Sequence, residues 1–149
     1  MTLKQWFENG WLKPHQTTHD EIENLFQIVD RDLQDAASDL SADWRFGIAY
    51  NAALKLCTIL LYAEGYKAER NLQHYRTIQA LSKILGTEKN DDAIYLDTCR
   101  TKRNTAEYDS VGVVTDRDSD ELIDFVKSFK EEVLTYLKNK HPALLSNKE

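Results

Sequence analysis

Residues 41–65 read SADWRFGIAYNAALKLCTILLYAEG, and this stretch decides the fold. Ser41 suits a helix N-cap, and Gly65 suits the position just after a helix end. Apolar residues lie around much of the helix circumference, which is typical of a helix that is buried on most sides. The apolar set consists of Trp44, Ile48, Ala49, Ala52, Leu56, Ile59, Leu60 and Ala63. Its alanines allow neighbouring helices to approach closely, so we predict that it is the central helix.

Two helices are predicted before this stretch. A short one, roughly Leu3 to Leu12, stops before Pro14. The next begins at Thr18, where Thr18 and Glu21 have the spacing of a capping box. Its apolar residues recur every three or four positions, which predicts one buried face. They are Ile22, Leu25, Phe26, Ile28, Val29 and Leu33.

Three more helices are predicted after it, each marked by capping or breaking residues. A polar loop from Gly65 to Gln73 leads to a helix over about 74–85, which Gly86 closes. Asn90 caps a helix whose first half turns Ala93, Ile94 and Leu96 inward, and which ends near Asp109. Residues 110–114 suggest an extended piece. The last helix begins near Asp118 or Ser119 and ends at Pro142.

These elements predict an all-α protein, an up-and-down helical bundle of about five helices plus a short N-terminal helix. The 149 residues suit one domain, with residues 1–17 as the N-terminal helix and lead-in and residues 141–149 as a frayed tail. Only five glycines and two prolines are present, which argues against a sheet-rich fold.

Charge and cysteine content narrow the function classes. A net charge of −6 argues against a protein that grips duplex DNA over a broad surface, although a local basic cluster can still hold a phosphate. Cys57 and Cys99 form no disulfide framework, so we expect reduced thiols and a cytoplasmic location. No signal peptide is evident. The longest apolar run, near 54–63, is interrupted by Lys55 and Thr58 and is too short for a bilayer, so we expect no membrane partner.

The second half of the predicted helix after Asn90 carries polar residues where packing residues are expected. Arg100, Asn104 and Tyr108 are four apart and share a face, and Arg103 and Glu107 form a second such pair. One interpretation is a network of ion pairs, with Arg103 on Glu107 and Arg100 on an acid of a neighbouring helix. The other is a ligand site.

As a ligand site, this face suits a nucleotide. The guanidinium of Arg103 matches a phosphate bidentately. Asn104 would orient a ligand oxygen or ribose hydroxyl, and Tyr108 would stack on a base. His74 and Arg76 have two interpretations: His74 caps its helix while Tyr75 packs by its ring, or His74 or Arg76 reaches the Arg103 cluster.

Other chemistries find little support. His15 and His19 are four apart, but Pro14 and the cap at Thr18 keep them off one regular helix, and no cysteine is near. We therefore expect no metal, and no cofactor either, since no glycine-rich phosphate loop is present. Acid pairs such as Asp91-Asp92 stand at helix starts, where they complement the helix dipole.

The arrangement resembles the HEPN domain family (higher eukaryotes and prokaryotes nucleotide-binding) from about Thr18 to Leu137. Arg103-Asn104, near the end of the penultimate helix, matches the family's Arg-Asn pair, and His74 resembles the histidine that often opens the preceding helix. Three segments look like an uncharacterised bacterial branch of the family: residues 10–15 (GWLKPH), 42–46 (ADWRF) and 74–79 (HYRTIQ).

The resemblance implies a homodimer that acts on RNA or a nucleotide. Many HEPN proteins are metal-independent ribonucleases whose motif is an Arg followed after four to six residues by a His. Many act in toxin–antitoxin or defence systems beside a small nucleotidyltransferase, which the resemblance makes an expected partner here.

This chain departs from that motif at one position. Tyr108 stands where the histidine is expected, and a tyrosine with an ordinary pKa of about 10 is a poor general base at neutral pH. Three hypotheses follow. The first is a module that binds RNA or a nucleotide through Arg100, Arg103, Asn104 and Tyr108 without cleaving it. The second is a ribonuclease in which Arg103 works with His74 or Tyr108. The third is a ligand-free dimeric adaptor.

Overall fold

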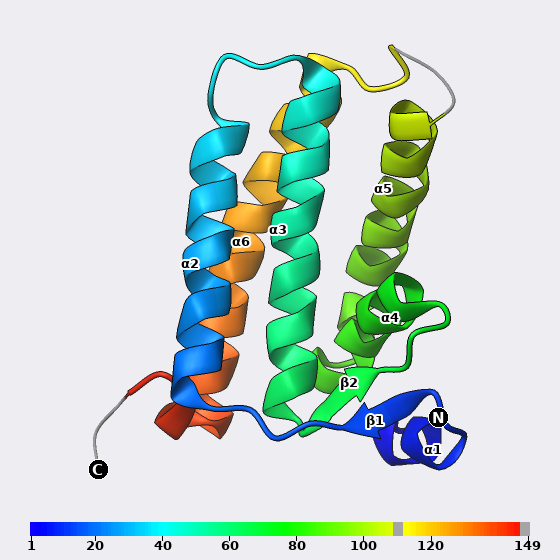
Figure 1. Cartoon of the computed structure of the whole chain (residues 1–149), viewed down its shortest axis with the longest axis vertical. Coiled ribbons are helices and arrows are strands. Elements are labelled where there is room, and N and C mark those ends of the chain that lie inside the picture. The colour runs from blue at the N-terminus through cyan, green and yellow to red at the C-terminus, as the bar shows by residue number, and fades with distance from the viewer. Residues whose placement is uncertain (109–111, 147–149) are drawn as a thin grey trace.

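The computed structural model describes residues 1–108 and 112–146, with the side chains of Glu107 and Tyr108 outside what is described. It confirms the all-α fold. Four long helices run alternately up and down (Figure 1): α2 (His19–Ala36), α3 (Ala42–Ala63), α5 (Asn90–Tyr108) and α6 (Asp116–Lys140). The shorter helices are α1 (Leu3–Glu8) and α4 (Gln73–Leu85), which completes the predicted set of five helices plus a short N-terminal one over the described residues.

Helix α3 is central, as predicted, and contacts α2, α4, α5 and α6. Its buried side chains include Phe46, Tyr50, Leu56, Ile59 and Leu60. By length and composition the 22-residue helix could also cross a membrane, which the sequence analysis did not expect from its apolar run. However, 61% of the apolar window is buried inside the bundle, so these residues form the core here.

The N-terminal segment differs from the prediction. Helix α1 ends at Glu8 instead of continuing to Leu12, because Gly10 adopts a left-handed φ of 80° that breaks the helix. The chain then forms strand β1 (Leu12–Pro14), which pairs antiparallel with β2 (Tyr66–Ala68). Strand β2 lies within the predicted polar loop, so that loop contains a short sheet.

The predicted capping signals are met in part. The Thr18 hydroxyl accepts from the backbone N–H of Glu21 at 3.1 Å, but the Glu21 carboxylate accepts from Thr17 and pairs with His15 instead of returning to the cap. Ser41 precedes α3 without a side-chain cap bond. Helix α6 starts two residues earlier than predicted, because Thr115 and Asp118 form a complete capping box.

The start of α4 corrects the interpretation of His74. Leu72 precedes the helix in a left-handed conformation with φ of 56°, and Gln73 is the first helical residue. His74 is therefore inside the first turn and does not cap it. Asn90 likewise is the first residue of α5, after a 3-10 turn over Thr87–Lys89, and adopts helical dihedrals itself.

The predicted extended piece over residues 110–114 lies partly outside the described residues, and the described part, 112–114, forms a bend and no strand. At the C-terminus, Pro142 begins a 3-10 turn (Pro142–Leu144), so part of the predicted frayed tail is ordered.

Two residues expected in the core are on the surface. Ile94 is 62% exposed, and Trp44, in the first turn of α3, is 68% exposed. Helical periodicity alone misplaced Trp44, because the apolar residues of α3 cover more of its circumference than its neighbours bury. An aromatic side chain is thereby left in solvent beside α5.

A candidate anion-binding site

Tyr50 of α3 lies at the centre of the candidate site. Its side chain is fully buried, and its hydroxyl is also buried with no hydrogen-bond partner in the described part of the chain. Burial raises the pKa of Tyr50 above its ordinary value, although Arg100 and Arg103 oppose the shift. The hydroxyl therefore keeps its proton and can donate to an acceptor.

Two of the predicted residues meet at the Tyr50 ring. The guanidinium carbon of Arg103, from α5, lies 5.5 Å from the ring centroid, within cation–π range. The His74 ring, from α4, has its centroid 6.4 Å from that of Tyr50. The fold thus brings His74 to the same ring as Arg103, which agrees with the interpretation that His74 reaches the arginine cluster.

Arg100 lies one turn before Arg103 on α5 and joins the same region. Its Nε donates to Asp97 at 2.8 Å, so its acidic partner is on its own helix, and the prediction of a partner on a neighbouring helix was wrong. The guanidinium carbon also lies 5.8 Å from the Tyr75 ring centroid. Tyr75 is 39% exposed and offers its ring to this arginine.

The electrostatics of His74 follow from this gathering. Partial burial of its imidazole, together with the positive charges of Arg103, Lys55 and Arg100, lowers the pKa of His74 below its ordinary value. His74 forms no hydrogen bond or ion pair with the residues described. It is therefore a neutral imidazole at physiological pH, surrounded by cations.

The remaining predicted residues are divided. Asn104 is on the same helix at intermediate exposure, and its side chain forms no hydrogen bond within the described part of the chain. The predicted Arg103–Glu107 pair and the role of Tyr108 fall on side chains outside the described residues. Arg76 points elsewhere: its guanidinium carbon lies 4.0 Å from the centroid of the Trp11 ring.

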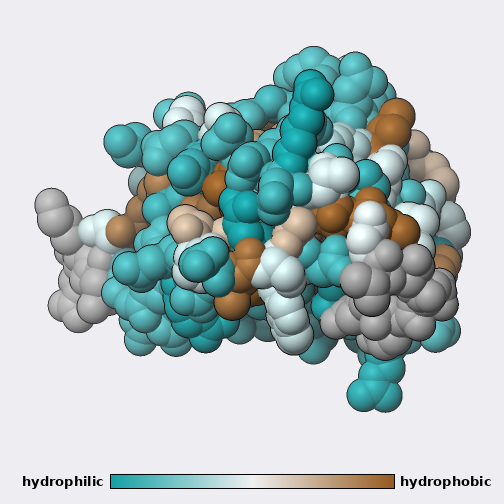
Figure 2. Space-filling model, turned by 90° about the horizontal axis from the view of Figure 1, so that it is seen from above, coloured by the Kyte–Doolittle hydropathy of each residue, from teal (hydrophilic) through white to brown (hydrophobic). Residues whose placement is uncertain are grey.

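A pocket of about 250 Å³ opens beside this cluster, between α3 and α5. It is lined by Asp43, Trp44, Gly47, Ile48, Asn51, Arg103 and Ala106. Trp44 was not foreseen as a site residue, because the sequence analysis assigned it to the core. Seen from above (Figure 2), the end of the bundle where α3 begins is largely hydrophilic, and the hydrophobic residues visible there lie in separate small patches.

The other three histidines lie together at the opposite end of the bundle, each on a glutamate. The Nε2–Oε distances are 2.7 Å for His15–Glu21, 2.9 Å for His19–Glu23 and 2.7 Å for His141–Glu64. His15 lies before α2 and His19 is its first residue, so the two share no regular helix, as predicted.

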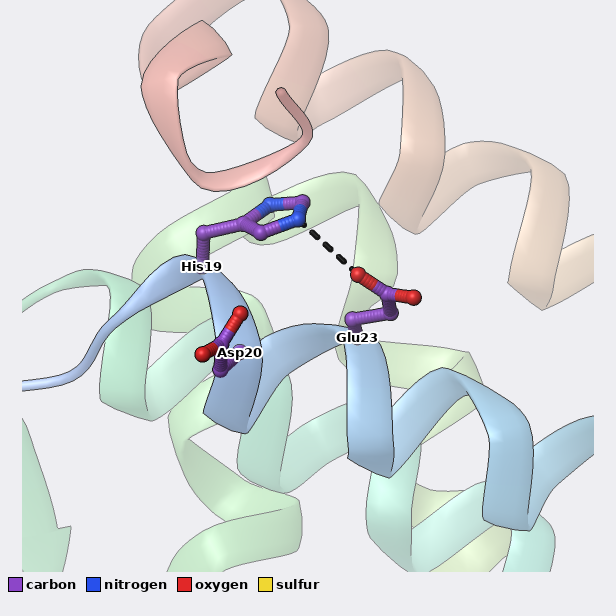
Figure 3. A group of neighbouring side chains, drawn as sticks. All are labelled: His19, Asp20 and Glu23. Atoms are coloured by element: carbon purple, nitrogen blue, oxygen red, sulfur yellow. Dashed lines mark ion pairs between the residues drawn. The ribbon is translucent and has the colours of Figure 1, made fainter. Parts of the chain in front are cut away.

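The metal question concerns His19, Asp20 and Glu23, whose potential ligand atoms all lie within 4.8 Å of one another. Figure 3 shows that both acidic groups project from α2 and that His19 already pairs with Glu23. The other ring nitrogen of His19 donates to the Leu144 carbonyl at 3.0 Å. This bond ties the C-terminal turn to α2, and it accounts for the position of His19 without an ion.

Both cysteines are buried and unpaired with each other. Burial raises the pKa of Cys57 to about 12 and that of Cys99 to about 11, so neither thiol is a nucleophile near neutral pH.

Comparison of the chain with protein-family models, with curated proteins and with solved structures finds no match. The functional argument therefore depends on the residues themselves.

Proposed function

We propose that this protein binds single-stranded RNA or a nucleotide, with a phosphate held at Arg103 and Arg100 and contacted by His74 and Tyr50. The observation that supports this most strongly is the meeting of residues from three helices, α3, α4 and α5, at one buried tyrosine whose hydroxyl has no protein partner.

The unpartnered hydroxyl supports a ligand on energetic grounds. A buried polar group without a hydrogen bond costs about 1–3 kcal/mol, so native structures rarely retain one without a reason. A phosphate or ribose oxygen that displaced the side chains covering the Tyr50 hydroxyl would accept a hydrogen bond from it and remove that cost. Guanidinium groups nearby would supply charge-assisted bonds to the same anion.

The charge balance supports a compact anion over an extended duplex. The positive charges of Arg103, Lys55 and Arg100 all act on His74, and Arg100 is paired with Asp97. The protein as a whole carries −6, so attraction for a polyanion depends on local groups of cations such as this one. A single phosphate with its nucleoside, free or within a single strand, matches the size of such a site.

A second function is favoured by the position of His74: metal-independent RNA cleavage. Its neutral imidazole would take the proton of a ribose 2′-hydroxyl as that oxygen attacks the adjacent phosphorus. The bond from phosphorus to the 5′-oxygen would break, and that oxygen would take a proton from water, giving a 2′,3′-cyclic phosphate and a 5′-hydroxyl. Arg103 would stabilise the charge on the phosphorus oxygens.

The wider assignment follows the HEPN resemblance. On that basis we include in the proposal a cytoplasmic homodimer acting in a toxin–antitoxin or defence system, with a small nucleotidyltransferase as partner. The third hypothesis, a ligand-free adaptor, does not explain why the buried hydroxyl of Tyr50 has no hydrogen-bond partner in the described part of the chain.

The decisive experiment incubates wild type and Arg103→Ala with labelled single-stranded RNA in chelator and scores retention and cleavage together. We expect wild type to retain RNA and the variant to bind about 10–100-fold more weakly, the range for losing one charged hydrogen-bond partner. Lys130→Ala is the matched control, because Lys130 pairs with Asp30 of α2 on a different face.

The outcomes separate the hypotheses. Cleavage that His74→Ala abolishes would establish the ribonuclease, and retention without cleavage would establish the binding module. Equal RNA binding by wild type and Arg103→Ala, or no binding by either, would refute the site.

A further inference from the structure

Gly47 is an unexplained residue in the second turn of α3. Glycine inside a helix costs about 1 kcal/mol relative to alanine, so its presence usually reflects a close approach or an unusual backbone. Neither applies here: Gly47 has no positive φ, and an added Cβ would meet no atom within 4 Å. The space above Gly47 belongs to the pocket beside Arg103.

The walls of that pocket have a consistent chemistry. Trp44 offers an aromatic side chain that is 68% exposed. Asp43 and Asn51 line the same space, and within the described part of the chain neither side chain forms a hydrogen bond or ion pair. Arg103 forms the side of the pocket nearest the anion site, where its guanidinium lies over Tyr50.

We propose that this pocket is a nucleobase subsite, in which a guanine lies over Gly47 against Trp44 while its phosphate is held at Arg103. The inference rests on the proposed function and adds to it which base of the ligand the protein recognises. The volume of about 250 Å³ is just below the ~300–1,000 Å³ typical of sites for drug-sized ligands, and so suits one base.

The choice of guanine follows from Asp43. An ionised carboxylate only accepts hydrogen bonds, so it favours a base edge with adjacent donors. Guanine presents two neighbouring N–H donors on its Watson–Crick edge, whereas adenine presents one amino group beside an acceptor. Asn51 can donate and accept, and it would contact a further edge atom. Stacking on an aromatic side chain is tolerant of any base, so the carboxylate carries the selectivity.

The test uses two labelled RNAs, an oligouridylate and the same strand with one central guanosine, with binding followed by anisotropy. We expect the guanosine strand to bind wild type about tenfold more tightly. Gly47→Leu should remove that advantage by filling the pocket, and leucine is a better helix former than glycine. Asp43→Asn should reduce the preference, measured as the ratio of the two affinities, whereas loss of structure would weaken the binding of both strands together.

Guanosine 5′-monophosphate, added as a competitor, shows whether the site takes a free nucleotide or a nucleotide within an RNA strand. Competition by the mononucleotide as strong as that by the RNA would assign the site to a free nucleotide, and competition only by RNA would assign it to a strand. Both results support the subsite.

Failure of the subsite and failure of the proposed function look different. If Arg103→Ala abolishes RNA binding but Gly47→Leu and Asp43→Asn leave guanosine preference intact, the anion site stands and the subsite is wrong. If no variant changes RNA binding, both are wrong. Thermal unfolding of each variant confirms that the comparison is between folded proteins.

Discussion

The four histidines divide between two regions that treat charge in opposite ways. At the end of the bundle that holds the start of α2 and the end of α6, His15, His19 and His141 each contact a glutamate within 2.9 Å. Beside Tyr50, His74 has cations around it and no acidic partner in the described part of the chain. The same residue type thus contacts a carboxylate in one region and lies among cations in the other.

The difference indicates which region serves the fold and which serves a ligand. In the first region the contacts join separate elements: His141, after α6, and Tyr136, within it, both contact Glu64 at the end of α3. In the second region, cations gather beside a buried hydroxyl that has no hydrogen-bond partner in the described part of the chain, an arrangement that a bound anion would stabilise. Substitutions should therefore change stability in one region and binding in the other.

The largest effect on stability is expected from Glu64→Ala. Its carboxylate accepts from the Tyr136 hydroxyl at 2.8 Å and contacts His141 at 2.7 Å, so its removal leaves a part-buried hydroxyl unsatisfied. We expect a loss of about 1–3 kcal/mol in the free energy of unfolding, measured with urea, and no change in RNA binding. Glu23→Ala, an exposed pair, is the control and should cost less than about 1 kcal/mol. Weakened RNA binding by Glu64→Ala would contradict the claim that this region serves stability and not binding.

The next largest effect is expected in the pH dependence of RNA binding. A bound phosphodiester favours the imidazolium form of His74 and raises a pKa that lies below about 6.5 in the free protein. Binding therefore takes up a proton, and affinity should rise as the pH falls from 7 towards the pKa of His74 in the free protein. The full rise should be about tenfold for each unit by which the ligand raises that pKa. Anisotropy at several pH values measures the trend, and His74→Gln should flatten it. If His74 is a catalytic base, cleavage should fall over the same range.

A smaller effect distinguishes the hydroxyl of Tyr50 from that of Tyr136. Tyr50→Phe removes a group without a protein partner, so we expect unfolding free energy to stay constant or rise by up to about 1 kcal/mol, while RNA binding weakens several-fold. Tyr136→Phe removes a hydroxyl that donates to Glu64 and should lose about 1 kcal/mol without changing RNA binding. A clear destabilisation by Tyr50→Phe would show that its hydroxyl is satisfied by the protein.

The smallest expected effect is that of Gly47→Ala, which should stabilise the protein by about 0.5–1 kcal/mol, because the backbone there is ordinary helix and the methyl group meets open space. Gly86→Ala should have the opposite sign, since Gly86 adopts φ of 114° and an added Cβ would meet the Glu88 carboxylate. Thermal unfolding of the pair measures both. Destabilisation by Gly47→Ala would mean that this glycine serves packing and not the pocket.

The helices were predictable from sequence because periodicity and caps are local signals. The pattern of residues 41–65 identified the central helix, and Gly65 and Gly86 marked helix ends. The β1–β2 pairing was not predictable, because each strand is only three residues long and its partner lies more than fifty residues away. The candidate site was predicted in part. Arg103 and His74 were recognised by type, whereas Trp44 was assigned to the core and Tyr50 was not singled out, because only packing shows that Tyr50 is buried and Trp44 is exposed.

The β1–β2 pairing also has a kinetic consequence. Residues 12–14 reach residues 66–68 across the whole of α2 and α3, so closing this contact costs more chain entropy than any helical hydrogen bond. The N-terminal segment contributes Trp6 and Leu12 to a small second core with Ala68, and we expect this core to form after the helices are in place. Hydrogen exchange should show that the β1–β2 pair opens more readily than the helical bundle. Each opening would free the chain that leads to Leu72 and the first turn of α4, which links the N-terminus of the protein to the position of His74.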